Sequence, residues 1–85
     1  MDISVYRSKP DVVRVIKWKD RYWDDDTIFS RIVQFCNGVK FKKDDIKDGD
    51  FLVKDLSNNV TIINGKEFLK HYEYVAKLAL PKMEQ

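Results

Sequence analysis

The sequence predicts a small α+β domain: a mostly antiparallel sheet of three to five short strands, with one central helix and one C-terminal helix. The run at 11–18 is rich in β-branched residues, and the short apolar runs at 51–55 and 60–63 are typical of the two strands of a hairpin. Two stretches, at 27–36 and from residue 65 onward, place apolar residues along one face of a helix. Asn and Gly lie between these segments and predict the turns that connect them.

The length of 85 residues predicts one compact domain. Within it, residues 1–9 are expected to form an N-terminal arm or an edge strand, and residues 82–85 a frayed tail. Eleven aromatic residues (five Phe, four Tyr and two Trp) supply enough apolar surface for a core in so short a chain. Pro10 restricts Lys9 to extended conformations and separates the arm from the next element.

The clearest strand is Asp11–Trp18. Its apolar side chains alternate between the two faces, with Val12, Ile16 and Trp18 on one face and Val13 and Val15 on the other. A strand with apolar residues on both faces is typical of the interior of a sheet, or of a strand that is covered on both sides.

The first helix is expected over Thr27–Cys36, after a loop at 19–26 that is dense in charged and aromatic residues. Asp24–Asp26 are predicted to cap its N-terminus, because carboxylates accept hydrogen bonds from free backbone amides and complement the helix dipole. The apolar stripe of this helix consists of Ile28, Ile32, Phe35 and Cys36, and is broadened by Phe29 and Val33. Asn37 and Gly38 tolerate the left-handed conformation that ends a helix.

The second half of the chain predicts a hairpin and a further helix. A short strand is expected over Val39–Phe41, followed by a solvated connection at 42–50. Phe51–Asp55 and Val60–Ile63 then form two strands joined by a turn that contains two Asn residues. Asn64 is the expected N-cap of the last helix.

In that last helix Glu67 is expected to reach back to the cap, and the apolar stripe consists of Phe68, Leu69, Tyr72, Val75 and Ala76. Periodicity leaves residues 72–80 open between a continuation of the helix and a short strand.

Two groups of motifs resemble a family of very small phage and prophage proteins of unassigned function. The first group is Lys9-Pro10 with the strand and closing Trp of VVRVIKW. The second is the Gly-Asp-aromatic-aliphatic strand at 49–54, followed by Phe68 and Tyr72-Glu73. The resemblance implies a phage or prophage source and an α+β fold, and it implies no catalytic residues. The chain departs from the family in its N-terminal arm, its longer tail and its bulkier RYWDDD loop at 21–26.

The sequence argues against an enzyme and indicates no cofactor and no metal. His71 is the only imidazole and is expected at the surface, while Cys36 lies on the apolar helix stripe and is expected to be a buried thiol. One cysteine excludes an intramolecular disulfide and a cysteine-based zinc site. The aspartates at 24–26 and 44–50 lack the ligand spacing of a calcium loop.

The phage resemblance implies a location in the cytoplasm of a bacterial host cell. The N-terminus has no apolar run of a signal peptide, and no stretch approaches the roughly 20 apolar residues of a membrane span.

Protein binding is the favoured function. Arg, Tyr and Trp are enriched at interface hot spots, and Arg21, Tyr22 and Trp23 are adjacent in one loop, followed by Asp24 and Asp25. We therefore expect a small non-enzymatic accessory protein that binds a host protein through these five residues, with inhibition of that protein as one consequence. The competing interpretation is that Tyr22 or Trp23 folds inward and caps the core.

Nucleic-acid binding is the alternative function. It would use a local surface of basic side chains, with Tyr22 and Trp23 available for stacking: Lys17, Lys19, Arg21, Lys40, Lys42 and Lys43. The net charge of +2 gives this alternative no general support. A homodimer is also open, because an unpaired edge of a small sheet can pair with a second copy.

Overall fold

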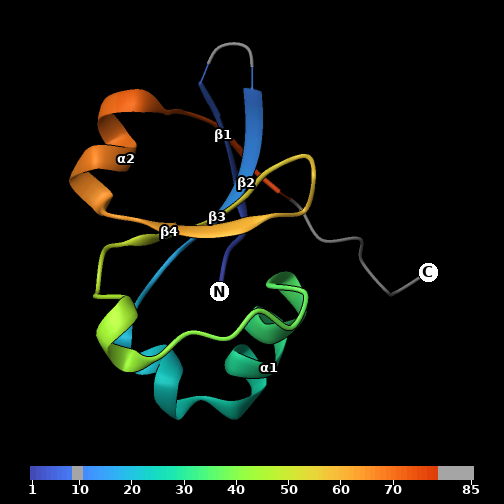
Figure 1. Cartoon of the computed structure of the whole chain (residues 1–85), viewed down its shortest axis with the longest axis vertical. Coiled ribbons are helices and arrows are strands. Elements are labelled where there is room, and N and C mark those ends of the chain that lie inside the picture. Colours follow the sequence, from blue (N-terminus) through green and yellow to red (C-terminus); the bar gives the residue numbers. More distant parts are fainter. Residues whose placement is uncertain (9–10, 79–85) are drawn as a thin grey trace.

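The computed structural model describes residues 1–8 and 11–78, which form a five-stranded antiparallel sheet and two α-helices (Figure 1). In chain order the elements are β1 (Ser4–Ser8), β2 (Asp11–Lys17), the 3-10 turn η1 (Asp20–Asp24), α1 (Asp26–Phe35), the 3-10 turn η2 (Lys43–Asp45), β3 (Phe51–Lys54), β4 (Val60–Ile63), α2 (Gly65–His71) and β5 (Glu73–Lys77). The predicted α+β class and antiparallel sheet are confirmed. The expected frayed tail at 82–85 lies outside the described residues.

The strand order is β4-β3-β2-β1-β5. The N-terminal arm is therefore an interior strand, because β1 lies between β2 and β5. Residues 72–80, which periodicity left open, contain β5 after the end of α2, and residues 79 and 80 lie outside the described part. Val75 and Ala76, expected on a helix stripe, consequently lie in a strand.

Both faces of β3 and of the second half of β2 are buried, as the pattern of 11–18 predicted, whereas Val12 near the start of β2 is 42% exposed. On one face Ile16 is paired with Leu52, and this pair packs under α1 with Ile32. On the other face Val15 is paired with Val53, and Phe68 of α2 belongs to the same cluster. The sheet thus separates two small cores, one on the α1 side and one on the α2 side.

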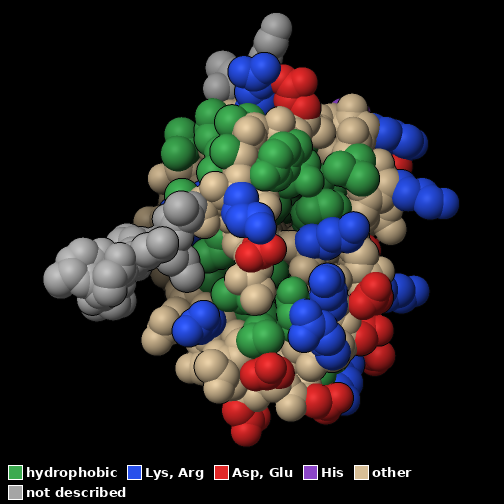
Figure 2. All heavy atoms as spheres, turned by 180° about the vertical axis from the view of Figure 1, so that it is seen from behind, with side chains coloured by type: hydrophobic (Ala, Val, Ile, Leu, Met, Phe, Trp, Pro, Cys, Tyr) green, Lys and Arg blue, Asp and Glu red, His purple; other side chains and the backbone are tan. Residues whose placement is uncertain are grey.

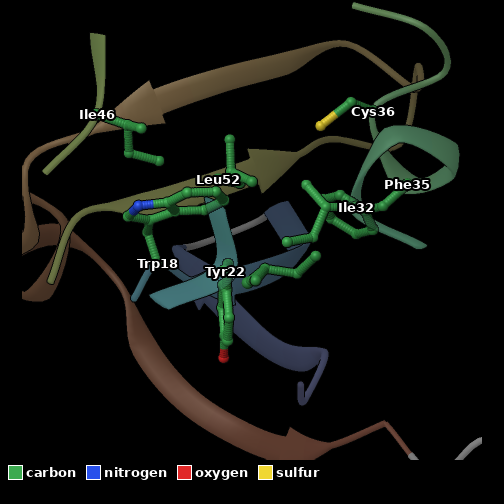
Figure 3. Close-up of a cluster of buried hydrophobic side chains, with 8 residues drawn as sticks. Trp18, Tyr22, Ile32, Phe35, Cys36, Ile46 and Leu52 are labelled. Atoms are coloured by element: carbon green, nitrogen blue, oxygen red, sulfur yellow. The ribbon is translucent and has the colours of Figure 1, made fainter. Parts of the chain in front are cut away.

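The core on the α1 side is built around Trp18, which is fully buried (Figure 3). Tyr22 from η1, Ile46 from the connection to β3, and Leu52 from β3 surround it. Figure 3 shows the hydroxyl group of Tyr22 pointing away from this cluster. One indole ring therefore joins the β2–η1 segment to the segment around Ile46 and β3, which lies more than 20 residues further along the chain.

The predicted caps of α1 are present. The Asp25 carboxylate accepts a hydrogen bond from the amide of Ile28 at 3.0 Å, which makes Asp25 the N-cap. At the other end Asn37 and Gly38 have φ values of 53° and 81°, as expected for residues that end a helix. The prediction of a short strand over Val39–Phe41 is wrong. The amide of Val39 instead donates to the carbonyl of Cys36 at 2.9 Å, which keeps this segment at the end of the helix.

The hairpin and the start of α2 form as predicted, with one difference at Glu67. Asn58 takes a φ of 65° in the turn, and Asn64 caps α2 by accepting from the amides of Lys66 and Glu67. The Glu67 side chain, expected to reach back, instead contacts Lys70 at 3.4 Å and His71 at 4.0 Å. Lys70 lies one turn ahead of Glu67 on the same helix face, where a carboxylate and an ammonium group attract each other.

Candidate protein-binding surface

The turn η1 places the predicted contact residues in different environments. Tyr22, predicted to contact a partner, is only 3% exposed and packs edge-to-face on Trp18 at 5.4 Å between ring centroids. Burial raises the pKa of its hydroxyl above the ordinary value, and Arg21 opposes that shift. The ring is turned inward because the short 3-10 turn directs this position toward the core. Tyr22 is thus part of the core rather than of a free surface.

Trp23 is half-buried and lies at the surface of the same core. Its ring centroid is 4.9 Å from that of Trp18, and 5.5 Å from those of Phe29 and Phe41. The ammonium group of Lys43 lies 6.0 Å from the Trp23 ring centroid, within reach of a cation–π interaction. One part of the Trp23 ring therefore packs on the buried core, and another part is exposed to solvent.

An apolar groove lies beside this ring, between α1 and the segment that follows it. It has a volume of about 290 Å³ and is lined by Phe29, Val33, Gly38, Val39, Lys40 and Phe41. Val33 and Val39 are 42% and 51% exposed, so the groove presents aliphatic side chains directly to solvent. Because Phe29 and Phe41 also contact Trp23, the ring and the groove form one continuous surface.

A second, polar depression also borders Trp23. It has a volume of about 390 Å³ and is lined by Asp20, Trp23, Asp24, Lys43, Ile46 and Lys47. Trp23 thus contacts two aromatic residues of the apolar groove and also borders a depression that carries charges of both signs. An apolar centre with a charged margin is the usual arrangement of a protein interface.

Of the charged residues predicted to contact a partner, two are exposed at the surface and one caps α1. Asp24 is exposed and lines the polar depression. Arg21 is exposed, and its guanidinium carbon lies 5.3 Å from the centroid of the Tyr22 ring. The Asp25 carboxylate is engaged by the amide of Ile28, so its position in the structure is explained by helix capping.

The sequence interpretation missed the aliphatic part of this surface, which consists of Val33 and Val39. The sequence did contain an indication of it: the apolar stripe on α1 is wider than the part of the helix that packs on the core. Phe29 and Val33 lie at the flank of that stripe and reach the groove. The exposure of Val39 was not indicated by the neighbouring residues, because the segment at 39–41 was predicted to be a strand.

The basic residues of the nucleic-acid alternative are spread over separate depressions. Lys17 and Lys19 line one depression together with Asp2, Tyr6 and Tyr22. Lys40 lines the apolar groove, and Lys43 the polar depression. The face in Figure 2 mixes basic and acidic side chains over the same area, with hydrophobic side chains gathered toward the top.

The aspartates considered as metal ligands hold turns in place. The carboxylates of Asp45, Asp48 and Asp50 accept backbone hydrogen bonds from Lys42, Asp20 and Lys47, at 2.8–3.0 Å. Within residues 1–8 and 11–78, no group of three or more His, Cys, Asp or Glu side chains is arranged to hold a metal ion.

Cys36 and His71 lie where the sequence placed them. The Cys36 thiol is 1% exposed, and burial raises its pKa above the ordinary value, while nearby Lys54 opposes the shift. His71 is exposed at the end of α2.

The helices of the described segments are too short or too polar to cross a membrane. Among known proteins, no family model, no curated protein and no solved structure matches this chain.

Proposed function

We propose that this chain is a non-enzymatic protein-binding domain, and that its contact surface is Trp23 together with the apolar groove. The observation that carries the proposal is the exposure of Val33 and Val39, at 42% and 51%, beside a half-buried tryptophan. Exposed aliphatic groups around an anchored aromatic ring are typical of the centre of an interface, where a few residues supply most of the binding free energy.

The partner is expected to insert a large apolar side chain into the groove. Lys40 lines the groove and Lys43 lies over Trp23, so an acidic group beside that side chain would pair with one of them. Asp24 belongs to the charged margin, where it affects the rate and specificity of association more than its affinity. Tyr22 and Asp25 support this surface from within the fold.

We propose a host protein of a bacterium as the partner, in the bacterial cytoplasm, because the sequence motifs resemble those of small phage and prophage proteins. A domain without catalytic groups acts on a larger protein by occupying one of its surfaces. Inhibition of the host protein is the expected result when the occupied surface is needed for that protein's activity.

The test is affinity capture from bacterial lysate with three immobilised chains. Wild type is compared with Val33→Lys, which places a charge in the groove, and with Leu69→Lys as the matched control. Leu69 is 58% exposed on α2, away from the groove, so both variants exchange an exposed aliphatic residue for lysine. Circular dichroism must show that all three chains are folded.

We expect one host protein to be retained by wild type and Leu69→Lys and lost with Val33→Lys. The purified host protein should then bind with a Kd at least tenfold weaker to Val33→Lys. Equal binding of all three chains would show that the groove is not the contact surface. Loss of activity of the host protein on adding wild type, but not Val33→Lys, tests inhibition separately.

A further inference from the structure

The sheet has two edge strands, β4 and β5, and each is paired on one side within the described residues. An edge strand presents unpaired N–H and C=O groups that can bind another strand. Proteins protect such edges with charged side chains and with bulges that break the regular ladder. The two edges of this sheet differ in both respects.

The β5 edge is protected. Its ends carry Glu73, which pairs with Arg7, and Lys77, which pairs with Asp2 at 3.4 Å. Its register with β1 shifts by one residue, because Tyr6 is opposite Tyr74 whereas Val5 is opposite Ala76. Val75 is the inserted residue of this bulge.

The β4 edge has neither protection. Its sequence is VTII, and its pairing with β3 is regular from Lys54↔Val60 to Phe51↔Ile63. The whole segment from 56 to 65 contains no charged residue, in a chain that is 35% charged. Figure 1 shows this strand next to β3, with α2 continuing from its end.

The hairpin geometry identifies which backbone groups of β4 are free. The amide of Asp55 donates to the carbonyl of Asn59 at 3.0 Å, and hydrogen-bonded and non-bonded pairs alternate along an antiparallel ladder. Thr61 and Ile63 therefore exchange bonds with β3. The N–H and C=O groups of Val60 and Ile62 point to the open side.

We propose that two copies of this chain associate through β4, with the strands antiparallel and Thr61 of each copy opposite Thr61 of the other. In this register Val60 of one copy exchanges both backbone bonds with Ile62 of the second copy, so all the free groups of both strands are satisfied. Val60 and Ile62 lie on the α1 side of the sheet, and the register keeps them on the same side in both copies. Threonine pairs are favourable across antiparallel strands.

We expect the partner of the β4 edge to be a second copy of this chain, because two uncharged β4 strands can pair with each other. Two neutral segments meet without the repulsion that like charges would create, whereas at the β5 edge such a pairing would meet the bulge. Four residues on each side are few compared with the roughly 20–30 residues a side of a standard interface. The dimer is therefore expected to dissociate on dilution.

Sedimentation velocity over a range of protein concentrations tests the proposal. Wild type should shift from monomer to dimer as concentration rises. Thr61→Lys and Thr61→Glu should each remain monomeric at the same concentrations, because each places like charges opposite one another across the two-fold axis. An equimolar mixture of the two variants should regain the dimer, because lysine then faces glutamate.

Val75→Lys on the β5 edge is the matched control, and it should dimerise as wild type does. The proposal is overturned by a wild type that stays monomeric at the highest concentration, or by a Thr61→Lys variant that dimerises normally. Loss of the dimer with Val75→Lys alone would assign the contact to β5 and overturn it as well. The groove variant Val33→Lys should keep the dimer, which separates this proposal from the one on host-protein binding.

Discussion

The indole rings of Trp18 and Trp23 meet edge-to-face, with 4.9 Å between their centroids and an interplanar angle of 64°. Trp18 is fully buried at the end of β2, whereas Trp23 is half-buried beside the groove. The proposed binding surface is therefore supported directly by the largest side chain of the core. A change at Trp23 will affect both binding and folding, so binding is tested better at Val33.

The difference in burial between the two tryptophans predicts a difference in stability. Trp18→Ala should lower the free energy of unfolding by about 3–5 kcal/mol, as for other large aromatic residues removed from cores. Trp23→Ala should lower it by less than half as much, because part of that ring already faces solvent. Urea unfolding followed by circular dichroism gives both values. An equal or larger loss for Trp23→Ala would show that its ring is mainly a core element.

The buried thiol of Cys36 predicts a loss of stability at alkaline pH. Burial raises the pKa of this thiol in the folded chain, so the unfolded chain releases its proton first. The stabilisation is fully present below the ordinary thiol pKa of about 8.5, and it is lost as the pH rises above that value. The urea concentration at the unfolding midpoint of wild type should therefore decrease as the pH is raised from about 7.5 to about 9.5, an interval that spans the ordinary thiol pKa.

Cys36→Ala is the matched control for this pH dependence. It removes the titrating thiol, so its urea midpoint should fall less over the same interval than that of wild type. Tyr22, whose pKa is raised as well, titrates in both chains and cancels in the comparison. An identical decrease in the two chains would mean that the thiol ionises as freely in the folded state as in the unfolded state.

Features that depend on neighbouring residues could be predicted from the sequence. Asp25 and Asn64 are caps, and Asn37 ends α1, because side chains and backbone groups a few residues apart decide each feature. The two-faced burial of β2 was equally visible in its alternation.

Features that depend on distant residues could not be predicted. The position of β1 inside the sheet requires the pairing of Tyr6 with Tyr74, and nothing near either residue indicates the other. Tyr22 and Trp23 are adjacent and of similar character, and only the path of η1 decides which ring turns inward. The position of the candidate surface beside Trp23 depends on that orientation, so it could not be predicted from the sequence.

The close approach of two loops predicts an unusual glycine at the start of α2. A Cβ atom on Gly65 would clash with the carbonyl oxygen of Gly49, which is backbone and cannot move aside independently. Gly65→Ala should therefore lower the free energy of unfolding, although alanine is favoured over glycine within helices by about 1 kcal/mol.

Gly38→Ala provides the comparison for Gly65→Ala. No atom lies within 4 Å of a Cβ at Gly38, but its φ of 81° is unfavourable for alanine, at a cost of about 1–2 kcal/mol. We expect the larger loss at Gly65, measured by urea unfolding of the two variants. A Gly65→Ala chain as stable as wild type would mean that the two loops separate at little cost.

The distribution of the lysines predicts weak or absent binding of nucleic acid. Lys17 and Lys19 are separated from Lys40 and Lys43 in different depressions, and Asp2 lies beside the first pair. Phosphate contacts are strongest at low salt, so a gel shift with single-stranded and duplex DNA at low ionic strength is the most sensitive measurement. We expect no retained complex under these conditions. The nucleic-acid alternative would be favoured over host-protein binding by a complex that forms at low salt and weakens steeply as salt is added. Such a complex should also be lost in a Lys17→Glu/Lys19→Glu variant, because each phosphate contact made by a lysine contributes to the salt dependence.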